Sequence, residues 1–122
     1  SLTVTSEFGA RTHPITKEAD FHKGTDLAAE EGDDIYAVLS GTVVESEFSE
    51  GYGNHIRLRH QDGTESFYAH CSKLLAKEGD QIKQGEVIAK VGSTGTSTGP
   101  HLHFGYLIHG KFVDPTAVLE HA

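Results

Sequence analysis

The segment from residue 54 to residue 70 constrains the fold most, because it contains two strand patterns joined by a tight turn. Apolar and polar side chains alternate over residues 54–60, which is the period of two expected of a β-strand with one buried face. Gln-Asp-Gly-Thr at 61–64 is a strong hairpin signal, and residues 65–70 form the expected returning strand. The chain is therefore expected to contain an antiparallel sheet.

Most of the remaining chain also favours strands. The 14 glycines and the short apolar runs are typical of strands joined by tight turns. Further strands are predicted at 41–48, 86–91, 101–108 and 111–113, the last two separated by a His109-Gly110 turn. Helix is expected only over 72–77 and after Pro115. The predicted fold class is all-β, mainly an antiparallel sheet with very little helix, in a single domain over residues 1–122.

Composition narrows the function classes. The chain has 10 Lys and Arg against 18 Asp and Glu, a net charge of −8. This charge argues against binding to nucleic acid or anionic lipid, which requires clustered basic side chains. No apolar run approaches the ~20 residues that a membrane-spanning helix needs. The single Cys excludes a disulfide framework and zinc modules built on two or more cysteines. The nine His raise the expectation of a metal or acid-base site.

Two smaller features concern organisation. Glu31-Gly32-Asp33-x-Ile35 is echoed by Glu78-Gly79-Asp80-x-Ile82, which predicts two similar turn-and-strand units in one sheet. The glycine, serine and threonine residues of 92–100 predict a surface loop beside a strand. Because the chain lacks an initiator Met and a signal segment, it is expected to be a processed product or an excised domain.

Strand parity groups several candidate site residues. Side chains two positions apart share a face of a strand, so His101 and His103 are expected on one side. The same rule places Tyr68 and His70 together and Cys71 on the opposite side, as a buried structural thiol. Each strand is thus expected to have one polar, ligand-rich face.

His22 and Asp26 are four residues apart and share a face in either a helical turn or an extended segment, with Gly24 allowing a sharp bend. Two His and one carboxylate match catalytic zinc sites with three protein ligands and a fourth position for water. His-Glu-x-x-His is absent, so the base is expected to be another imidazole. Taken singly, each motif also fits a plain surface loop, water-facing histidines or a cross-strand pair; their combination argues against those readings.

The combination resembles a known family. The motifs that carry the resemblance are Ser6-x-Phe8-Gly9-x-Arg11-x-x-Pro14, His22-x-Gly24-x-Asp26, Gly53-Asn54, Tyr68-Ala69-His70 and Gly95-x-Ser97-x-Gly99-Pro100-His101-Leu102-His103-Phe104. Together they resemble the lysostaphin-type zinc metallo-endopeptidases of bacterial cell walls, over about residues 6–115. The resemblance implies an antiparallel β fold with a substrate groove across its main sheet.

The resemblance also implies roles for single residues. It implies that His22, Asp26 and His103 hold one Zn²⁺ ion, and that His70 and His101 lie beside the metal as unliganded catalytic groups. Tyr68 and Asn54 fall on motif positions and are candidate substrate contacts. The other five histidines are expected in loops or at the surface; they are His13, His55, His60, His109 and His121.

The implied function is hydrolysis of peptide bonds in peptidoglycan, either in cross-bridges or in stem-peptide cross-links. The implied location is the bacterial cell envelope or the outside of the cell. Peptidoglycan peptides are the expected partner of a monomeric domain, without nucleic acid and without membrane insertion. Two alternatives remain. One is a non-hydrolytic peptidoglycan-binding scaffold or activator of the same fold. The other is a biotinyl- or lipoyl-like carrier, which would need an exposed lysine at a hairpin tip, whereas Lys90 lies within the predicted strand 86–91.

Overall fold

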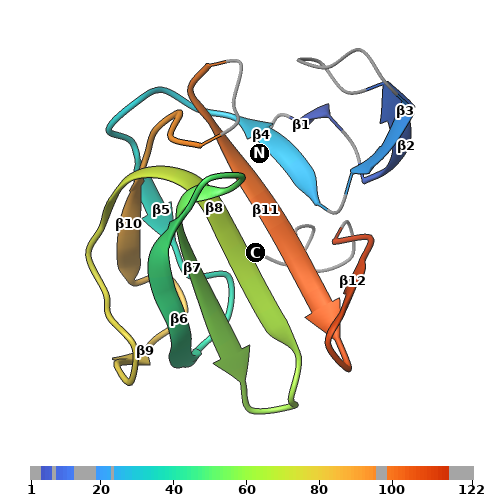
Figure 1. Cartoon of the computed structure of the whole chain (residues 1–122). Helices are drawn as coiled ribbons and strands as arrows, with labels where there is room; N and C mark the ends of the chain where they lie inside the picture. Colours follow the sequence, from blue (N-terminus) through green and yellow to red (C-terminus); the bar gives the residue numbers. More distant parts are fainter. Residues whose placement is uncertain (1–3, 7, 13–18, 23, 96–98, 116–122) are drawn as a thin grey trace.

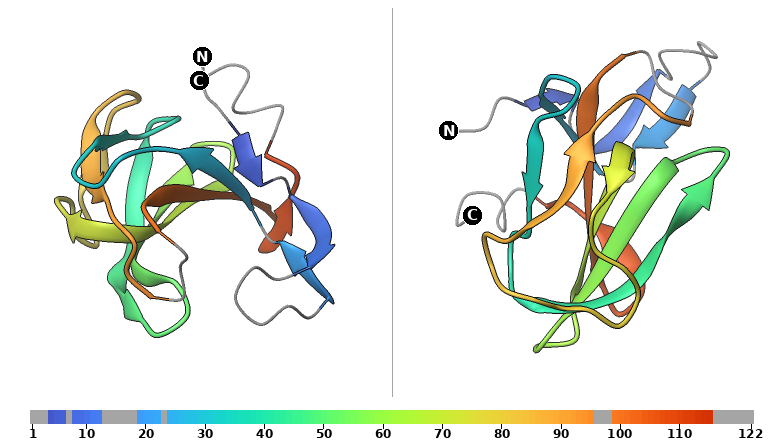
Figure 2. Two further views of the ribbon diagram at one scale, coloured as in Figure 1. Left: turned by 90° about the horizontal axis from the view of Figure 1, so that it is seen from above. Right: turned by 90° about the vertical axis from the view of Figure 1, so that its left-hand side faces the viewer.

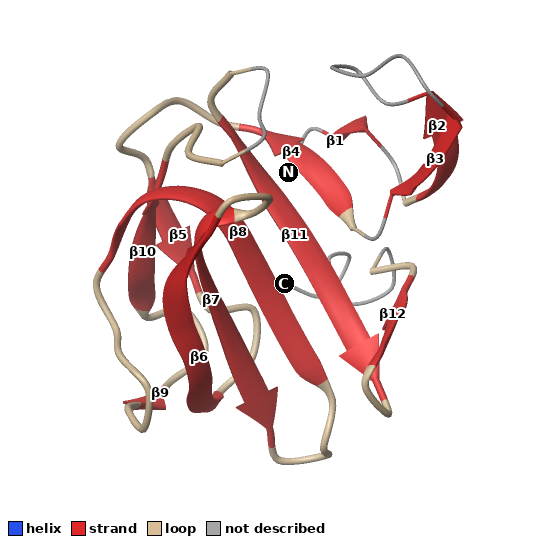
Figure 3. Ribbon diagram, viewed as in Figure 1, coloured by secondary structure: helices blue, strands red, loops and turns tan. Residues whose placement is uncertain are grey.

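The computed structural model describes residues 4–6, 8–12, 19–22, 24–95 and 99–115, and this part of the chain contains strands and no helix (Figures 1 and 3). No apolar helix of membrane-spanning length occurs in it. In chain order the strands are β1 (Val4–Ser6), β2 (Gly9–Thr12), β3 (Ala19–His22), β4 (Thr25–Ala28), β5 (Asp34–Tyr36), β6 (Gly41–Ser49), β7 (Gly53–His60), β8 (Glu65–Leu74), β9 (Gln81–Ile82), β10 (Val87–Val91), β11 (His101–Ile108) and β12 (Lys111–Val113).

Ten of these strands form one sheet, in the order β1-β4-β11-β8-β7-β6-β9, with β10 pairing β8 and β5, and β12 pairing β11. Strands β2 and β3 form a separate two-stranded sheet, which Figure 2 shows at one end of the molecule. Every strand pair is antiparallel. The all-β, antiparallel fold class predicted from sequence is confirmed.

The two faces of the central sheet carry different side chains. On one face Tyr68 of β8 pairs in register with Phe104 of β11, and both are fully buried in the main core. On the other face a smaller cluster forms around Phe67, Ala69 and Leu107. This second face also carries His103, which is in register with Ala69 and Asp26. The central strands therefore fix a polar constellation on one side while the other side closes the core.

The predicted strands agree well with the observed ones in the second half of the chain. The predictions at 101–108 and 111–113 match β11 and β12, and the 61–64 hairpin joins β7 to β8. The helix predicted at 72–77 is wrong, because β8 continues to Leu74 by pairing Lys73 with Lys90 of β10. The segment after Pro115 lies outside the described residues, and the single domain over 1–122 stays a prediction.

The two Gly-Asp turns have the same local geometry. In the first turn, Asp33 Oδ2 accepts the backbone N–H of Glu30 at 2.9 Å, and Gly32 has a φ of 91°. In the second, Asp80 Oδ2 accepts the backbone N–H of Lys77 at 2.9 Å, and Gly79 has a φ of 94°. Each turn leads into a short strand of the main sheet, β5 and β9. The echo seen in the sequence is therefore a repeated turn.

Candidate active site

Strands β4 and β11 bring a carboxylate and two imidazoles together. Their register pairs Asp26 with His103. Asp26 Oδ1 lies 2.9 Å from His103 Nδ1 and 3.6 Å from His101 Nε2. His101 and His103 thus share a face, as parity predicts, because β11 pairs with β4 over this segment without a register shift.

His70 joins this group through a break in strand parity. Its φ is 62°, in the left-handed region that a non-glycine residue rarely adopts, so its ring does not follow the alternation of β8. The His70 ring centroid lies 5.3 Å from that of His101 and 5.8 Å from that of His103. The expectation that Tyr68 and His70 share a face is wrong, since Tyr68 and Cys71 both lie in the main core.

Backbone carbonyls fix the tautomers of two of these imidazoles. Nδ1 of His70 lies 2.6 Å from the carbonyl oxygen of Thr94, and Nδ1 of His101 lies 2.8 Å from that of Gly99. A carbonyl oxygen only accepts hydrogen bonds, so each Nδ1 carries the proton. In the neutral state each ring therefore has its lone pair on Nε2, the form that accepts a proton.

Burial keeps the His70 imidazole neutral. Desolvation lowers the pKa of His70 to about 4, reinforced by the nearby rings of His103 and His101, and is only partly opposed by the Thr94 carbonyl and by Asp26. Because this value lies well below neutral pH, His70 holds its Nε2 lone pair throughout the neutral range. Its Nε2 is therefore available as a hydrogen-bond acceptor at neutral pH.

The loop after β10 supports His70 from behind. Thr94 Oγ1 donates to the carbonyl of Cys71 at 2.6 Å and accepts the backbone N–H of Asn54 at 3.0 Å. The Asn54 side chain donates to the same Cys71 carbonyl at 3.1 Å. Gly53 lies so close that an added Cβ would come within 2.3 Å of Thr94 Oγ1. In the described structure Asn54 thus ties β7 to Cys71, the residue that follows His70 in β8.

Tyr68 lies away from the candidate site, in the core. His60 Nδ1 donates to the Ser40 carbonyl at 2.9 Å, so His60 Nε2 accepts the Ser66 hydroxyl at 3.0 Å. The Ser66 oxygen then accepts the Tyr68 hydroxyl at 2.8 Å, and the Tyr68 oxygen accepts the Val38 N–H at 3.1 Å. The Tyr68 side chain is fully buried, and its hydroxyl already donates one hydrogen bond and accepts another. The structure therefore does not support a substrate contact for Tyr68.

The donor set fits a zinc ion. His22 ends β3, and its side chain lies outside the described residues. Asp26 and His103 offer an oxygen and a nitrogen 2.9 Å apart, close to the roughly 3.3 Å expected of two donors on one tetrahedral zinc. The absence of a side chain at Gly24 leaves room for the His103 ring, because a Cβ at this position would lie 2.8 Å from His103 Nε2. A carboxylate with imidazoles is a donor chemistry that zinc commonly accepts.

Two aromatic residues border the site without having been predicted. The ring centroid of Tyr52 lies 5.9 Å from that of His103 and 6.5 Å from that of His70. The Phe67 ring lies 6.3 Å from His103 and 4.8 Å from Tyr52, edge to face in both cases. The one available sequence signal was that Tyr52 directly precedes the Gly53-Asn54 motif.

The remaining histidines divide differently from the expectation. His55 and His60 are buried, so placing them in loops or at the surface was wrong. His109 occupies the exposed turn between β11 and β12, as expected. His13 and His121 lie outside the described residues.

An Asp and three His clustered on one face of an antiparallel β sheet fit a metal site, and the sequence comparisons identify the family as a peptidase family. The model of peptidase family M23 matches residues 20–115, and the chain belongs to this family. It is 44% identical over 115 residues to the DD-carboxypeptidase/endopeptidase Mpg of Neisseria meningitidis, covering 94% of this chain and 26% of that protein. It is 38% identical over 116 residues to the peptidoglycan DD-endopeptidase ShyC of Vibrio cholerae, covering 94% of this chain and 27% of that protein.

Solved structures agree with this assignment. The catalytic domain of the antimicrobial peptidase lysostaphin from Staphylococcus simulans superposes with a TM-score of 0.88 at 34% identity, covering 98% of this chain and 92% of that one. A zinc-containing peptidase from Vibrio cholerae superposes with a TM-score of 0.85 at 36% identity, covering 93% of this chain and 36% of that one. The chain spans about a quarter of the length of the curated relatives named above.

Proposed function

We propose that this chain is the catalytic domain of a zinc-dependent endopeptidase that hydrolyses peptide bonds in bacterial peptidoglycan. The observation that carries the proposal is the convergence of Asp26, His103, His101 and His70 on one face of the sheet. Backbone carbonyls hold the last two in the tautomer that accepts a proton at Nε2. Membership of peptidase family M23 supports the same chemistry.

In this proposal one zinc ion is held by His22, Asp26 and His103. Zinc bound by three protein ligands supplies a Lewis acid for the scissile carbonyl and lowers the pKa of water to about 7. Asp26 Oδ1 and His103 Nδ1, 2.9 Å apart, would be the donor atoms, and the tight fit of Gly24 against β11 holds His103 in one orientation. The two remaining imidazoles then act on protons.

His70 and His101 are assigned the proton transfers. Each neutral ring directs Nε2 away from the carbonyl that holds its Nδ1–H, so each can accept a proton at that nitrogen. One imidazole takes the proton of the attacking water, and a protonated imidazole donates to the leaving amine. The other is placed to donate to the oxyanion of the tetrahedral intermediate.

The proposed substrates are the D,D cross-links between stem peptides. Curated relatives at 38% and 44% identity are named as a DD-endopeptidase and a DD-carboxypeptidase/endopeptidase. Peptide bonds in the cross-bridges are the second candidate substrate. We propose that the domain acts outside the cytoplasm, in the bacterial cell envelope or outside the cell, because its relatives are named for action on peptidoglycan. We propose that it acts as a monomer.

The decisive experiment is digestion of defined muropeptides by the purified chain, with and without a chelator, read by mass spectrometry. The expected result is cleavage of cross-linked dimers to monomers, lost with chelator and restored by Zn²⁺. Binding of peptidoglycan without cleavage at any zinc concentration would instead favour the non-hydrolytic scaffold. The carrier alternative has no structural support, because Lys90 lies within β10 and pairs with Asp34.

The roles of single residues are tested by metal analysis together with turnover. His70→Ala and His101→Ala are each expected to lower kcat by about 100-fold or more while retaining zinc, the scale of a lost acid-base group. His103→Ala is expected to lose the metal itself. Full zinc occupancy in His103→Ala would refute its assignment as a ligand, and near-normal turnover in both other variants would refute theirs.

A further inference from the structure

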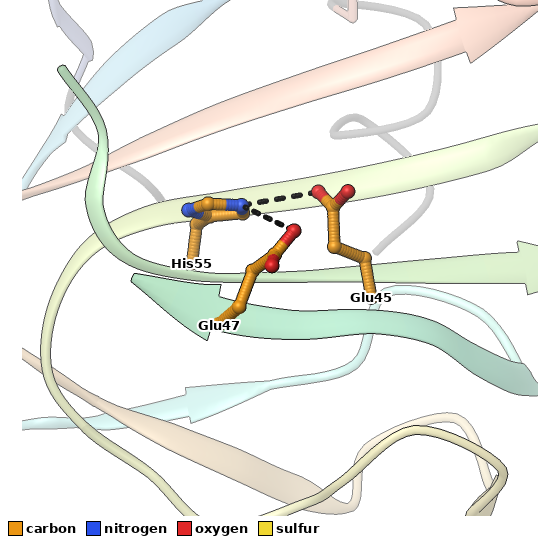
Figure 4. A group of neighbouring side chains, drawn as sticks. All are labelled: Glu45, Glu47 and His55. Atoms are coloured by element: carbon orange, nitrogen blue, oxygen red, sulfur yellow. Dashed lines mark ion pairs between the residues drawn. The ribbon is translucent and has the colours of Figure 1, made fainter. Parts of the chain in front are cut away.

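A second cluster of metal-ligating side chains lies on the same face of the sheet. Glu45 and Glu47 of β6 and His55 of β7 place one donor atom each within 4.8 Å of one another (Figure 4). His55 Nε2 lies 3.1 Å from Glu45 Oε1 and 3.9 Å from Glu47 Oε1. The imidazole side chain is 6% exposed, whereas that of Glu47 is 60% exposed and opens the cluster to solvent.

The orientation of His55 is set from outside the cluster. Its Nδ1 lies 3.1 Å from the carbonyl oxygen of Gly53, which only accepts, so Nδ1 carries the proton. The neutral ring therefore turns its Nε2 lone pair toward two carboxylates. A buried lone pair 3.1 Å from a carboxylate oxygen is repulsive unless a positive charge lies between them. That charge is either a second proton on the ring or a metal ion.

We propose that Glu45, Glu47 and His55 bind a divalent transition-metal ion such as Zn²⁺, as a second site separate from the catalytic one. One imidazole and two carboxylates are a suitable donor set for such an ion. A histidine whose other nitrogen donates to a backbone carbonyl is the usual arrangement of a metal ligand. The exposed side of Glu47 leaves room for water to complete the coordination.

The neighbouring arginine does not occupy the donor atoms that the ion needs. Arg57 Nη2 contacts Glu45 through Oε2, at 3.4 Å, which leaves Oε1 facing His55. Arg57 Nε is directed to Glu65 Oε1 instead, at 3.7 Å. The guanidinium thus orients the Glu45 carboxylate, and its charge makes the site weaker than one surrounded by acidic groups alone.

This site is distinct from the catalytic cluster. The ring of Tyr52 lies 6.0 Å from His55 on one side and 5.9 Å from His103 on the other. Phe67 likewise contacts both rings, at 5.4 and 6.3 Å. The two clusters are therefore separated by aromatic side chains and share no donor, so each can be emptied by mutation without touching the other. The inference does not depend on the proposed function.

The test is zinc stoichiometry of the folded protein after equilibrium dialysis against buffered Zn²⁺, measured by elemental analysis. The wild type is expected to hold about two ions per chain, and Glu47→Gln about one. Glu50→Gln removes the same charge from an exposed position of the same hairpin and is expected to keep both. Asp26→Asn is expected to lose the catalytic ion and keep the one at Glu47. His55→Gln is also expected to lose the ion at Glu47, and the circular dichroism of this variant shows whether it is folded.

Nitrogen NMR of the His55 imidazole distinguishes metal binding from the alternative, a second proton on the ring. Zinc binding is expected to shift the His55 Nε2 resonance at pH 7 in wild type and in Glu50→Gln, and not in Glu47→Gln. A doubly protonated His55 ring that is unchanged at saturating Zn²⁺ would overturn the proposal. So would a second ion that survives both Glu47→Gln and His55→Gln.

Discussion

At the scale of single residues, carbonyl oxygens decide which nitrogen of a histidine ring carries the proton, because a carbonyl can only accept a hydrogen bond. Carbonyl oxygens from Thr94 and Gly99 impose the same tautomer on His70 and His101. In the core, the carbonyl of Ser40 imposes a direction on the whole chain of hydrogen bonds that ends at Tyr68. The same rule thus prepares reactive groups on one face and stabilises the interior on the other.

Tyr68→Phe is expected to reduce stability without affecting substrate binding. The change leaves the buried Ser66 oxygen and the Val38 N–H without their partner, which costs about 1–3 kcal/mol of unfolding free energy. Urea denaturation measures the loss, and KM for a muropeptide is expected to stay unchanged. Tyr106→Phe, which removes a hydroxyl bonded to Thr64 at a half-buried position, serves as the control with a smaller loss. A raised KM with unchanged stability would return Tyr68 to the substrate site.

Cys71 is expected to be chemically inert in the folded protein. Its side chain is buried in the main core, and desolvation raises the pKa of the thiol from 9.0 to about 12. Since the thiolate is the reactive form, alkylation by iodoacetamide at pH 8 is expected only after addition of denaturant. Mass spectrometry of native and unfolded samples measures this; rapid labelling of the native protein would contradict the burial.

At the scale of elements, the candidate site depends on how the β6–β7 hairpin meets the loop after β10. Gly53 has a φ of 66° and approaches Thr94, whose carbonyl holds His70. The left-handed conformation and the close contact both require glycine here. We therefore expect a change in the hairpin to be transmitted to His70, the proposed catalytic group on β8.

Gly53→Ala is expected to lower kcat by about 100-fold, the effect of moving a catalytic group by about 1 Å. The added Cβ would lie 2.3 Å from Thr94 Oγ1, so the loop and the His70 ring must shift. Gly51→Ala is the matched control, because nothing lies within 4 Å of its added Cβ. Zinc content is expected to be normal in both variants. Equal activity of both variants would show that the loop does not position His70.

Strand parity predicted the side-chain directions correctly on β11 and wrongly on β8. His101 and His103 share a face because their stretch of β11 pairs with β4 without interruption. His70 combines a positive φ with a hydrogen bond to Thr94, 24 positions later, and no local pattern reveals either. Strands β1 to β4 have three or four residues each and were missed, since too few positions exist for an alternation to be visible.

At the scale of the whole molecule, the fold class was predictable from sequence and the assembly of the site only partly so. The hairpin at 61–64 and the long strands on either side determine the antiparallel centre. The face that gathers Asp26 with His103 depends on β4 crossing to the far side of β11, a pairing of residues 77 positions apart. Only the resemblance to a family, and not the strand pattern, brought these two residues together.

Removal of zinc is expected to destabilise the whole domain. Asp26 of β4 and His103 of β11 would be joined by the ion, so binding favours the folded state over the unfolded one. Saturation at 100 times Kd corresponds to about 2.7 kcal/mol, and chelation is expected to lower Tm by on the order of 10 °C. Differential scanning calorimetry with and without chelator measures the shift. An unchanged Tm in a chain shown to have lost its zinc would argue against this linkage.

The carbonyl contacts of His70 and His101 also bear on how the domain returns to its starting state after each reaction. With Nδ1–H held by Thr94 and Gly99, a proton can enter and leave each ring only through Nε2. Neither ring has to exchange tautomers between one turnover and the next, a step that would need solvent at a nitrogen facing the protein interior. In the proposed mechanism, a proton taken from water would therefore be returned through the same nitrogen, and recovery of the resting form would need no separate proton path to bulk solvent.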